Sequence, residues 1–187
     1  MAVLVPIASG TEEAEAVVTI DILRRANLEV LVAGLTSPVV CSRKVQIVPD
    51  TTADRIAEDM LFDAVVLPGG AEGTKQLMHS AWLRQLLQHH HQQQRWIAAI
   101  CAAPLILHVT HILQPGQMVT GHPTIKEHLV ERYVYLNQPV VVDGKIITSQ
   151  GMGTAVDFAL SIVSQLQSPA LAQEIADRIC YQWDSRR

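Results

Sequence analysis

Long apolar runs and basic clusters are both missing from this sequence. The longest mainly apolar stretch, at residues 96–107, falls short of the roughly 18 residues that a membrane span needs. The formal net charge is −4 and no block of basic residues is present, which argues against a nucleic acid held by charge neutralisation. We therefore expect neither a membrane protein nor a strong nucleic-acid binder.

Cysteine is also scarce. Cys41, Cys101 and Cys180 are odd in number and show no CxxC spacing. This pattern argues against a disulfide framework or a structural zinc site, and it favours a reducing compartment, so a cytoplasmic location is predicted. We expect Cys41 to be partly accessible beside a predicted hairpin, and Cys180 to pack within the last helix.

The remaining composition suits one ordinary domain. With 187 residues and 49% hydrophobic composition, the chain is long enough to bury a proper core, and no linker divides it. One domain over residues 1–187 is predicted. The N-terminus lacks a basic segment and runs directly into Glu12 and Glu13, which is typical of a first strand rather than of a signal peptide.

Strand and helix patterns alternate along the chain. Strands are predicted at residues 2–7, 28–33, 62–67, 96–100 and 118–120, with an edge hairpin at 39–48 and a second hairpin around Asp143-Gly144. Helices are predicted at residues 12–25, 71–78, 81–93, 104–107 and 124–132, from 151 to about 165, and from 169 to about 183. This order is typical of an α/β fold with a doubly wound, mostly parallel sheet and helices on both faces.

The turn after residue 100 carries the strongest functional signal. Cys101 follows an apolar run directly, and Pro104 suits the first turn of a helix. A strand, a sharp turn and a helix would expose a nucleophile to free helix amides, which favour thiolate over thiol. The competing interpretation is that Cys101 is a small buried hydrophobe, as many free cysteines are.

Glycines and one acid accompany this turn. In a parallel sheet, the loops at Ser9-Gly10, Gly69-Gly70, Cys101 and Gly121-His122 would share one edge, where ligands bind. The pair Gly69-Gly70 is compatible with turn geometry alone or with bare amides that face an oxyanion. Glu12 and Glu13 are expected to face solvent. Glu15 either shares that face or points inward, where it would be protonated and could exchange a proton with the thiol.

Histidines offer two weaker candidates. His122 is compatible with a base, a substrate contact or a structural hydrogen-bonding role. Three consecutive histidines at residues 89–91 invite a metal hypothesis, but consecutive helical positions diverge, whereas metal ligands need a spacing of four residues. No metal site is predicted.

Four motifs occur in order: GTEEAE at residues 10–15, LPGG at 67–70, AAICAAP at 98–104 and TSQGMGT at 148–154. On these motifs the chain, over residues 2–166, resembles the ThiJ/PfpI superfamily, in the branch of the human parkinsonism-associated deglycase and bacterial YajL. The resemblance implies a flavodoxin-like fold, no cofactor, and a homodimer in which the first helix helps to form the interface.

The resemblance also implies roles for individual residues. It implies that Cys101 is reactive and hydrogen-bonded to a protonated Glu15. By motif position, Arg25 and Arg43 match arginines near the dimeric active-site pocket, and His122 matches a histidine near the cysteine. Two residues depart from the family pattern: Ala102 stands where protease-like members have histidine, and Met152 replaces a proline. The first departure argues against a peptidase.

These observations together predict a cofactor-independent glyoxalase III or protein–nucleotide deglycase, which acts on methylglyoxal, glyoxal or their early adducts on proteins and nucleotides. Cys101 would attack the aldehyde, Glu15 with help from His122 would move protons, and amides near Gly70 and Ala102 would hold the oxyanion. The alternatives are a redox-sensing chaperone, whose cysteine is oxidised to sulfinic acid, and, more weakly, a cysteine hydrolase.

Overall fold

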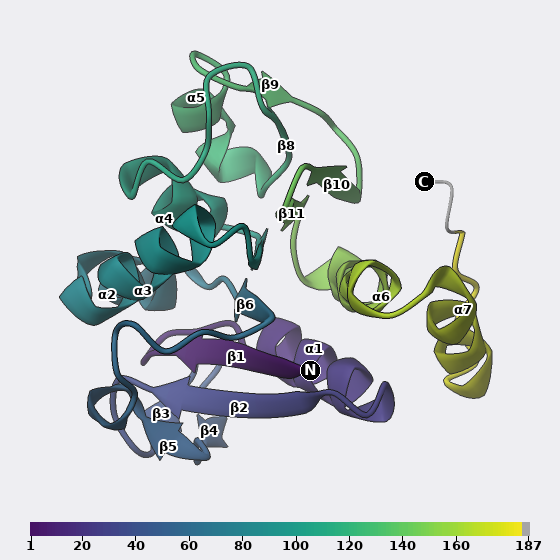
Figure 1. Ribbon diagram of the computed structural model, residues 1–187, viewed down its shortest axis with the longest axis horizontal. Helices are drawn as coiled ribbons and strands as arrows, with labels where there is room; N and C mark the ends of the chain where they lie inside the picture. The colour runs from purple at the N-terminus through teal and green to yellow at the C-terminus, as the bar shows by residue number, and fades with distance from the viewer. Residues whose placement is uncertain (185–187) are drawn as a thin grey trace.

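The computed structural model describes residues 1–184 of the protein. A seven-stranded sheet forms the centre of the molecule (Figure 1). Neighbouring strands are parallel throughout this sheet, except at one edge, where the two strands of the hairpin at residues 140–149 are antiparallel. The predicted α/β, mostly parallel architecture is therefore confirmed. The strands follow the order β10 (Val140–Asp143), β11 (Ile146–Ser149), β7 (Trp96–Ile100), β6 (Ala64–Leu67), β1 (Ala2–Ile7), β2 (Glu29–Gly34) and β5 (Thr51–Thr52).

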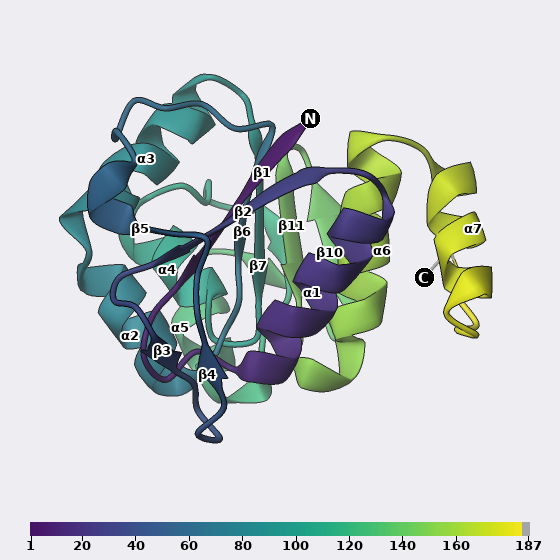
Figure 2. The same ribbon diagram turned by 90° about the horizontal axis from the view of Figure 1, so that it is seen from below.

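Helices cover both faces of this sheet (Figure 2). One face carries α1 (Glu13–Arg25) and α6 (Ala155–Leu166), with α7 (Pro169–Arg178) packed on α6 as an outer layer. The other face carries α2 (Ala71–His79), α3 (Ala81–Gln92), α4 (Pro104–Val109) and α5 (Lys126–Leu129). Within residues 1–184, no helix combines the length and the apolar character that crossing a bilayer requires.

The central strands are buried on both faces, which explains their nearly continuous apolar sequence. In β1, Val3 and Val5 belong to the core cluster under α1 and α6, whereas Leu4 belongs to the cluster under α2, α3 and α4. In β6, Val66 and Val65 divide between the two clusters in the same way. Alternating side chains thus fill two cores, as expected for a parallel sheet covered by helices.

The first predicted hairpin forms, but it does not lie at the edge of the main sheet. β3 (Val39–Val40) and β4 (Gln46–Ile47) pair antiparallel in a sheet of their own, and β5 is the edge strand. The hairpin instead closes over the loop after β1, because the Gly10 N–H donates to the Val40 carbonyl at 2.8 Å and the Ser42 N–H donates to the Thr11 carbonyl at 2.8 Å.

Later segments correct other details of the sequence prediction. β8 (Met118–Val119) pairs in parallel with β9 (Val134–Tyr135) in a separate two-stranded sheet. The helix predicted at residues 124–132 is a short 3-10 helix, Pro123–Ile125, followed by α5, which ends at Leu129. The last helix ends at Arg178 instead of near residue 183, and a 3-10 helix, Met152–Thr154, precedes α6.

Both expectations for the peripheral cysteines are wrong. Cys41 is only 2% exposed, because the β3–β4 hairpin folds back around it and its N–H donates to the Val45 carbonyl at 2.8 Å. Cys180 lies beyond the end of α7 with a φ of 57°, and it is exposed. All three cysteines are free thiols.

Candidate active site

Cys101 lies at the bend between β7 and α4, as the sequence predicted. Its φ is 64°, in the left-handed region that non-glycine residues rarely adopt and that costs on the order of 1–3 kcal/mol. Two neighbouring segments hold the bend: the Cys101 N–H donates to the Ser149 carbonyl at 3.0 Å, and the His122 N–H donates to the Cys101 carbonyl at 2.8 Å. The thiol is therefore fixed at the carboxyl edge of the sheet, partly open to solvent.

Glu15 points inward from the first turn of α1, next to this thiol. The side chain is 1% exposed, its Oε2 accepts a hydrogen bond from the Gly69 N–H at 2.8 Å, and its carboxyl group hydrogen-bonds to Cys101. This geometry decides between the two interpretations of Glu15: it faces the interior and not the solvated face.

Gly69 passes between the two functional side chains with no room for a side chain of its own. A Cβ added there would lie 2.6 Å from the Cys101 Cβ and 2.7 Å from Glu15 Oε2. At Gly151, on the opposite side of the site, a Cβ would lie 4.0 Å from both the Cys101 Sγ and Glu15 Oε1. Glycines on two loops therefore enclose the thiol and the carboxyl group together.

Two backbone amides approach the sulfur. The N–H groups of Gly70 and Ala102 both hydrogen-bond to Cys101. Gly70 has a φ of 90°, and a Cβ there would lie 2.3 Å from the Gly10 carbonyl oxygen, so only glycine fits this turn. The Gly69-Gly70 pair thus serves turn geometry and also directs the Gly70 amide at the thiol; its contact with an oxyanion stays a prediction.

Burial dominates the electrostatics of the site. It raises the pKa of Glu15 from 4.5 to about 7, against the opposing effects of the Gly69 N–H and Cys101. Burial, followed by the charge of Glu15, raises the pKa of the Cys101 thiol to about 12, whereas the Gly70 and Ala102 amides lower it. The direction is opposite to the depressed thiol pKa that the helix amides alone predicted, because the sequence does not reveal how deeply the sulfur is buried.

The Glu15 carboxyl group therefore changes its protonation near neutral pH, whereas the Cys101 thiol keeps its proton in the resting protein. An ionised Glu15 can accept the thiol proton. Once it has done so, the charge that raises the pKa of the thiol is gone, and the Gly70 and Ala102 amides partly offset the effect of burial on the sulfur. The arrangement can thus pass a proton from sulfur to carboxyl as the sulfur attacks an electrophile.

The sequence pattern of the DJ-1/PfpI family matches residues 1–165. The chain belongs to the DJ-1/PfpI family. It is 45% identical over 176 residues to Protein DJ-1alpha of Drosophila melanogaster, and this match covers 92% of this chain and 81% of that relative. It is also 37% identical over 171 residues to the Glutathione-independent glyoxalase DJR-1.2 of Caenorhabditis elegans, with 90% of each chain covered. The crystal structure of Drosophila melanogaster DJ-1beta has a TM-score of 0.92 at 41% identity, and covers 97% of this chain and 98% of that one.

His122 lies at the rim of the DJ-1/PfpI site. Its Nδ1 accepts a hydrogen bond from the Thr124 N–H at 3.3 Å and lies 2.8 Å from Thr124 Oγ1. Its Cδ2 would lie 3.6 Å from a Cβ on Gly151, so the ring borders the space beside the thiol. Because Nδ1 acts as an acceptor, the neutral ring carries its proton on Nε2 and suits donation to a substrate oxygen.

The two arginines singled out by motif position lie apart. Arg43 lines a cleft of about 480 Å³ that also includes Gly70. Arg25 is at the opposite end of α1 from Glu15, roughly 15 Å along the helix axis at about 1.5 Å per residue. Its Nε donates to Asp21 Oδ2 at 2.6 Å on the exposed surface. Within this chain, Arg43 lies on a cleft that shares Gly70 with the site, whereas Arg25 does not line that cleft; a role for either arginine at the thiol stays a prediction.

Glu13 is a buried carboxylate that sequence analysis missed. Its Oε1 accepts from the Arg43 N–H at 2.8 Å, and the Ser42 Oγ lies 2.8 Å from its Oε2 and 2.6 Å from Glu12 Oε2. Burial alone would raise the pKa of Glu13, but the N–H groups of Glu13 and Arg43 and the Ser42 hydroxyl leave it lowered. The expectation that Glu13 faces solvent is wrong, because the β3–β4 hairpin closes over the start of α1. Only the fold reveals this contact.

The three consecutive histidines do not form a metal centre. His90 is fully buried: its Nε2 accepts from the Phe62 N–H at 2.9 Å, and its Nδ1 lies 2.7 Å from the Leu86 carbonyl oxygen. Both ring nitrogens are thus used inside the protein. Across residues 1–184, no three histidine, cysteine, aspartate or glutamate side chains come together as metal ligands.

The two departures from the family pattern have different surroundings. Ala102 contributes its amide to the sulfur, so this position supplies a hydrogen-bond donor and no basic side chain. Met152 is 61% exposed in the 3-10 helix before α6 and lies beside Gly151. A methionine here replaces a rigid proline with a flexible side chain at the rim of the site.

Proposed function

We propose that this protein is a cofactor-independent glyoxalase that converts methylglyoxal or glyoxal to a 2-hydroxy acid, and that it also acts on early dicarbonyl adducts of proteins and nucleotides. The observation that carries the proposal is the Cys101–Glu15 pair, whose side chains hydrogen-bond to each other and accept N–H groups from Gly69, Gly70 and Ala102. The relative named as a glutathione-independent glyoxalase supports the same class of reaction.

The first step joins the Cys101 sulfur to the aldehyde carbon of methylglyoxal. The thiol proton passes through Glu15 to the carbonyl oxygen, which gives a hemithioacetal and leaves Glu15 ionised. Amides of Gly70 and Ala102 stabilise the oxyanion as charge develops on it. A pKa of about 7 suits Glu15 to both halves of this transfer at neutral pH.

Glu15 then removes the proton from the former aldehyde carbon while His122 gives its Nε2 proton to the ketone oxygen, which forms an enediol. Glu15 next gives its proton to the neighbouring carbon, and the hydroxyl group on the first carbon returns a proton to His122 Nε2. The result is a thioester in which the first carbon is oxidised and the second is reduced, so no external oxidant is needed. Water hydrolyses the thioester, which releases lactate and the free thiol.

The decisive experiment measures lactate formation from methylglyoxal. Cys101→Ser is expected to reduce turnover to the buffer rate, and Glu15→Gln is expected to lower it by about a hundredfold or more, as for loss of a general acid–base. The exposed thiol Cys180 provides the matched control, because Cys180→Ser leaves the site untouched. Full activity in the Cys101→Ser variant would contradict the mechanism.

Adduct repair requires a separate measurement. A preformed methylglyoxal adduct of an amine is incubated with the protein in the presence of excess free thiol, which traps any released dicarbonyl. Release of the amine faster than the spontaneous rate supports a deglycase. Release at the spontaneous rate restricts the protein to free dicarbonyls.

A redox-sensing chaperone is the second candidate. The amides of Gly70 and Ala102, together with the Glu15 carboxyl group, would stabilise the oxygen atoms of a sulfinic acid on Cys101. Mild peroxide followed by mass spectrometry distinguishes the candidates. Selective sulfinic acid at Cys101 favours a sensor, whereas equal oxidation at Cys180 argues against one.

A homodimer and a cytoplasmic location complete the proposal. The apolar side chains of Val17, which is 50% exposed, and Val48, which is 77% exposed, border one cleft on the surface of α1 and β4. A second copy docked there would cover this face and bring a further α1 near the site. Sedimentation of the native protein and of Val17→Lys tests this arrangement.

Three free thiols suit the reducing cytoplasm.

A further inference from the structure

β10 forms an open edge of the main sheet. Among residues 1–184 it pairs with β11 alone, with Val141 opposite Thr148 and Asp143 opposite Ile146. Beyond the strand, the Gln150 N–H donates to the Pro139 carbonyl, so the hydrogen-bonded positions on this strand are 139, 141 and 143. The N–H and C=O groups of Val140 and Val142 therefore point away from β11 and toward the outside of the sheet.

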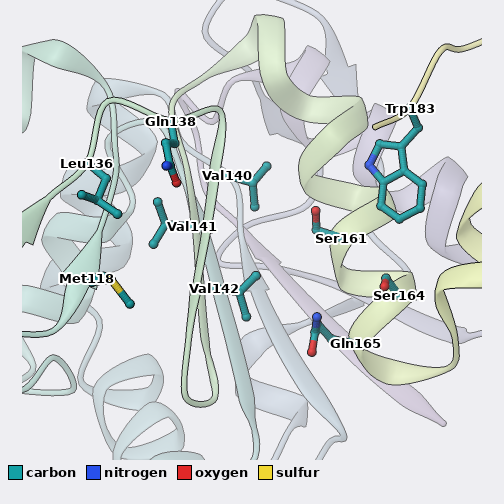
Figure 3. Close-up of a pocket in the computed structure, with 10 residues that line it drawn as sticks. All are labelled: Met118, Leu136, Gln138, Val140, Val141, Val142, Ser161, Ser164, Gln165 and Trp183. Carbon is teal, nitrogen blue, oxygen red and sulfur yellow. The ribbon is translucent and has the colours of Figure 1, made fainter. Parts of the chain in front are cut away.

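A groove runs along this edge (Figure 3). Met118 and Leu136 lie on one side of β10, and Ser161, Gln165 and Trp183 lie on the other. The groove, which we name the β10 groove, encloses about 390 Å³, within the range of about 300–1,000 Å³ that is typical of ligand pockets. Figure 3 shows the indole nitrogen of Trp183 on the side of its ring that faces β10. A strand edge thus lies between two walls.

The chemistry of the β10 groove specifies its occupant. A row of outward N–H and C=O groups is matched most fully by another extended backbone, which adds a strand at about 4.8 Å from β10. None of the residues that line the groove carries a charge, and Val142 is 38% exposed. Natural edge strands are usually protected by lysine, proline, a bulge or short length. β5, at the other edge, has two residues. β10 has four: three successive valines followed by Asp143.

We infer that the β10 groove binds an extended polypeptide segment with neutral side chains, which pairs with β10 as an eighth strand of the sheet. The occupant is a free-standing segment and not a second copy of this chain, because the β10 of another copy has the same flanking residues, with Met118 and Leu136 on one side and Ser161 and Trp183 on the other. A free-standing segment has no such walls and can enter between Leu136 and Trp183. The inference is independent of the Cys101 chemistry.

The test uses the peptide acetyl-Thr-Val-Thr-Val-Thr-amide and the full-length protein. Nuclear magnetic resonance follows the Val140 and Val142 amides and the Trp183 indole during titration. Saturable binding is expected, with hydrogen exchange at the two valine amides slowed at least tenfold. The same peptide with every backbone nitrogen methylated provides the matched ligand control, because it keeps the side chains and cannot donate hydrogen bonds; its binding should be at least tenfold weaker.

Two surface variants locate the site. Val142→Lys places a charge in the groove and should weaken peptide binding at least tenfold. Val134→Lys, at a 46% exposed valine on β9 outside the lining residues, should leave binding unchanged. Cys101→Ser should also leave it unchanged, which separates this inference from the proposed enzyme. Equal binding of the methylated peptide, or no effect of Val142→Lys, would overturn the inference. So would an oligomer of the native protein that Val142→Lys dissociates, since a second copy would then occupy the groove.

Discussion

The strongest quantitative consequence of the site concerns the stability of the protein as a function of pH. Glu15 is 1% exposed, and burial raises its pKa from 4.5 to about 7. Each tenfold change in an ionisation constant corresponds to about 1.36 kcal/mol, so ionising Glu15 in the folded protein costs about 3 kcal/mol more than in the unfolded chain.

The sign follows from the number of bound protons. Between about pH 4.5 and pH 7 the folded state holds the Glu15 proton and the unfolded state has released it. The contribution of Glu15 to stability is therefore fully present below pH 4.5, and it is lost as the pH rises through about 7. Glu15→Gln is neutral at every pH and removes this dependence.

Urea unfolding of both proteins at a series of pH values from 4 to 8 provides the assay. The difference in unfolding free energy, Glu15→Gln minus wild type, should rise by about 3 kcal/mol across this range. Glu29→Gln, which removes an exposed carboxylate on β2, is the control for the loss of a surface charge. A flat difference for Glu15→Gln would refute the assignment of Glu15 as a buried acid that is protonated near neutral pH.

Three further outcomes are expected from the structure. Gly69→Ala should lower the turnover of methylglyoxal about a hundredfold and the free energy of unfolding by about 1–3 kcal/mol, because the added Cβ would press on Cys101 and Glu15. Gly153→Ala is the control and should change neither quantity, since a Cβ there meets open space. His90→Ala should lower the free energy of unfolding in urea by about 3 kcal/mol, because it leaves a cavity and an unpaired Phe62 N–H in the interior. His91 is partly exposed, so His91→Ala should lower the free energy of unfolding far less. Iodoacetamide should modify Cys180 in the native protein and spare Cys41, since burial raises the pKa of the Cys41 thiol to about 11; mass spectrometry that finds Cys41 modified first would contradict this.

The parts of the fold that sequence reasoning predicted are those that local chemistry determines. The apolar run at β1 and the Asp143-Gly144 turn between β10 and β11 each contain the information for their own structure. The bend at Cys101 was predictable for the same reason, because an apolar strand, two small residues and Pro104 specify it locally.

Contacts between distant segments were not predictable. Glu13 is polar and stands at the start of a helix, so its sequence favours exposure; it is buried because Ser42 and Arg43 cover it from a hairpin about 30 residues away. Cys41 is inaccessible for a related reason. The placement of β8 outside the main sheet likewise depends on its pairing with β9, which no local pattern in residues 118–120 specifies.

The thiol pKa is the most instructive difference, because it changes the account of how the nucleophile is activated. Amides alone would hold a thiolate in the resting protein, but burial and the adjacent carboxylate oppose this and raise the pKa of Cys101. The nucleophile must then lose its proton during attack, and Glu15 is the acceptor within hydrogen-bonding distance. In the proposed mechanism, a base with a pKa of about 7 is matched to this task at neutral pH, so the alanine directly after the cysteine, in place of a histidine, is compatible with that mechanism.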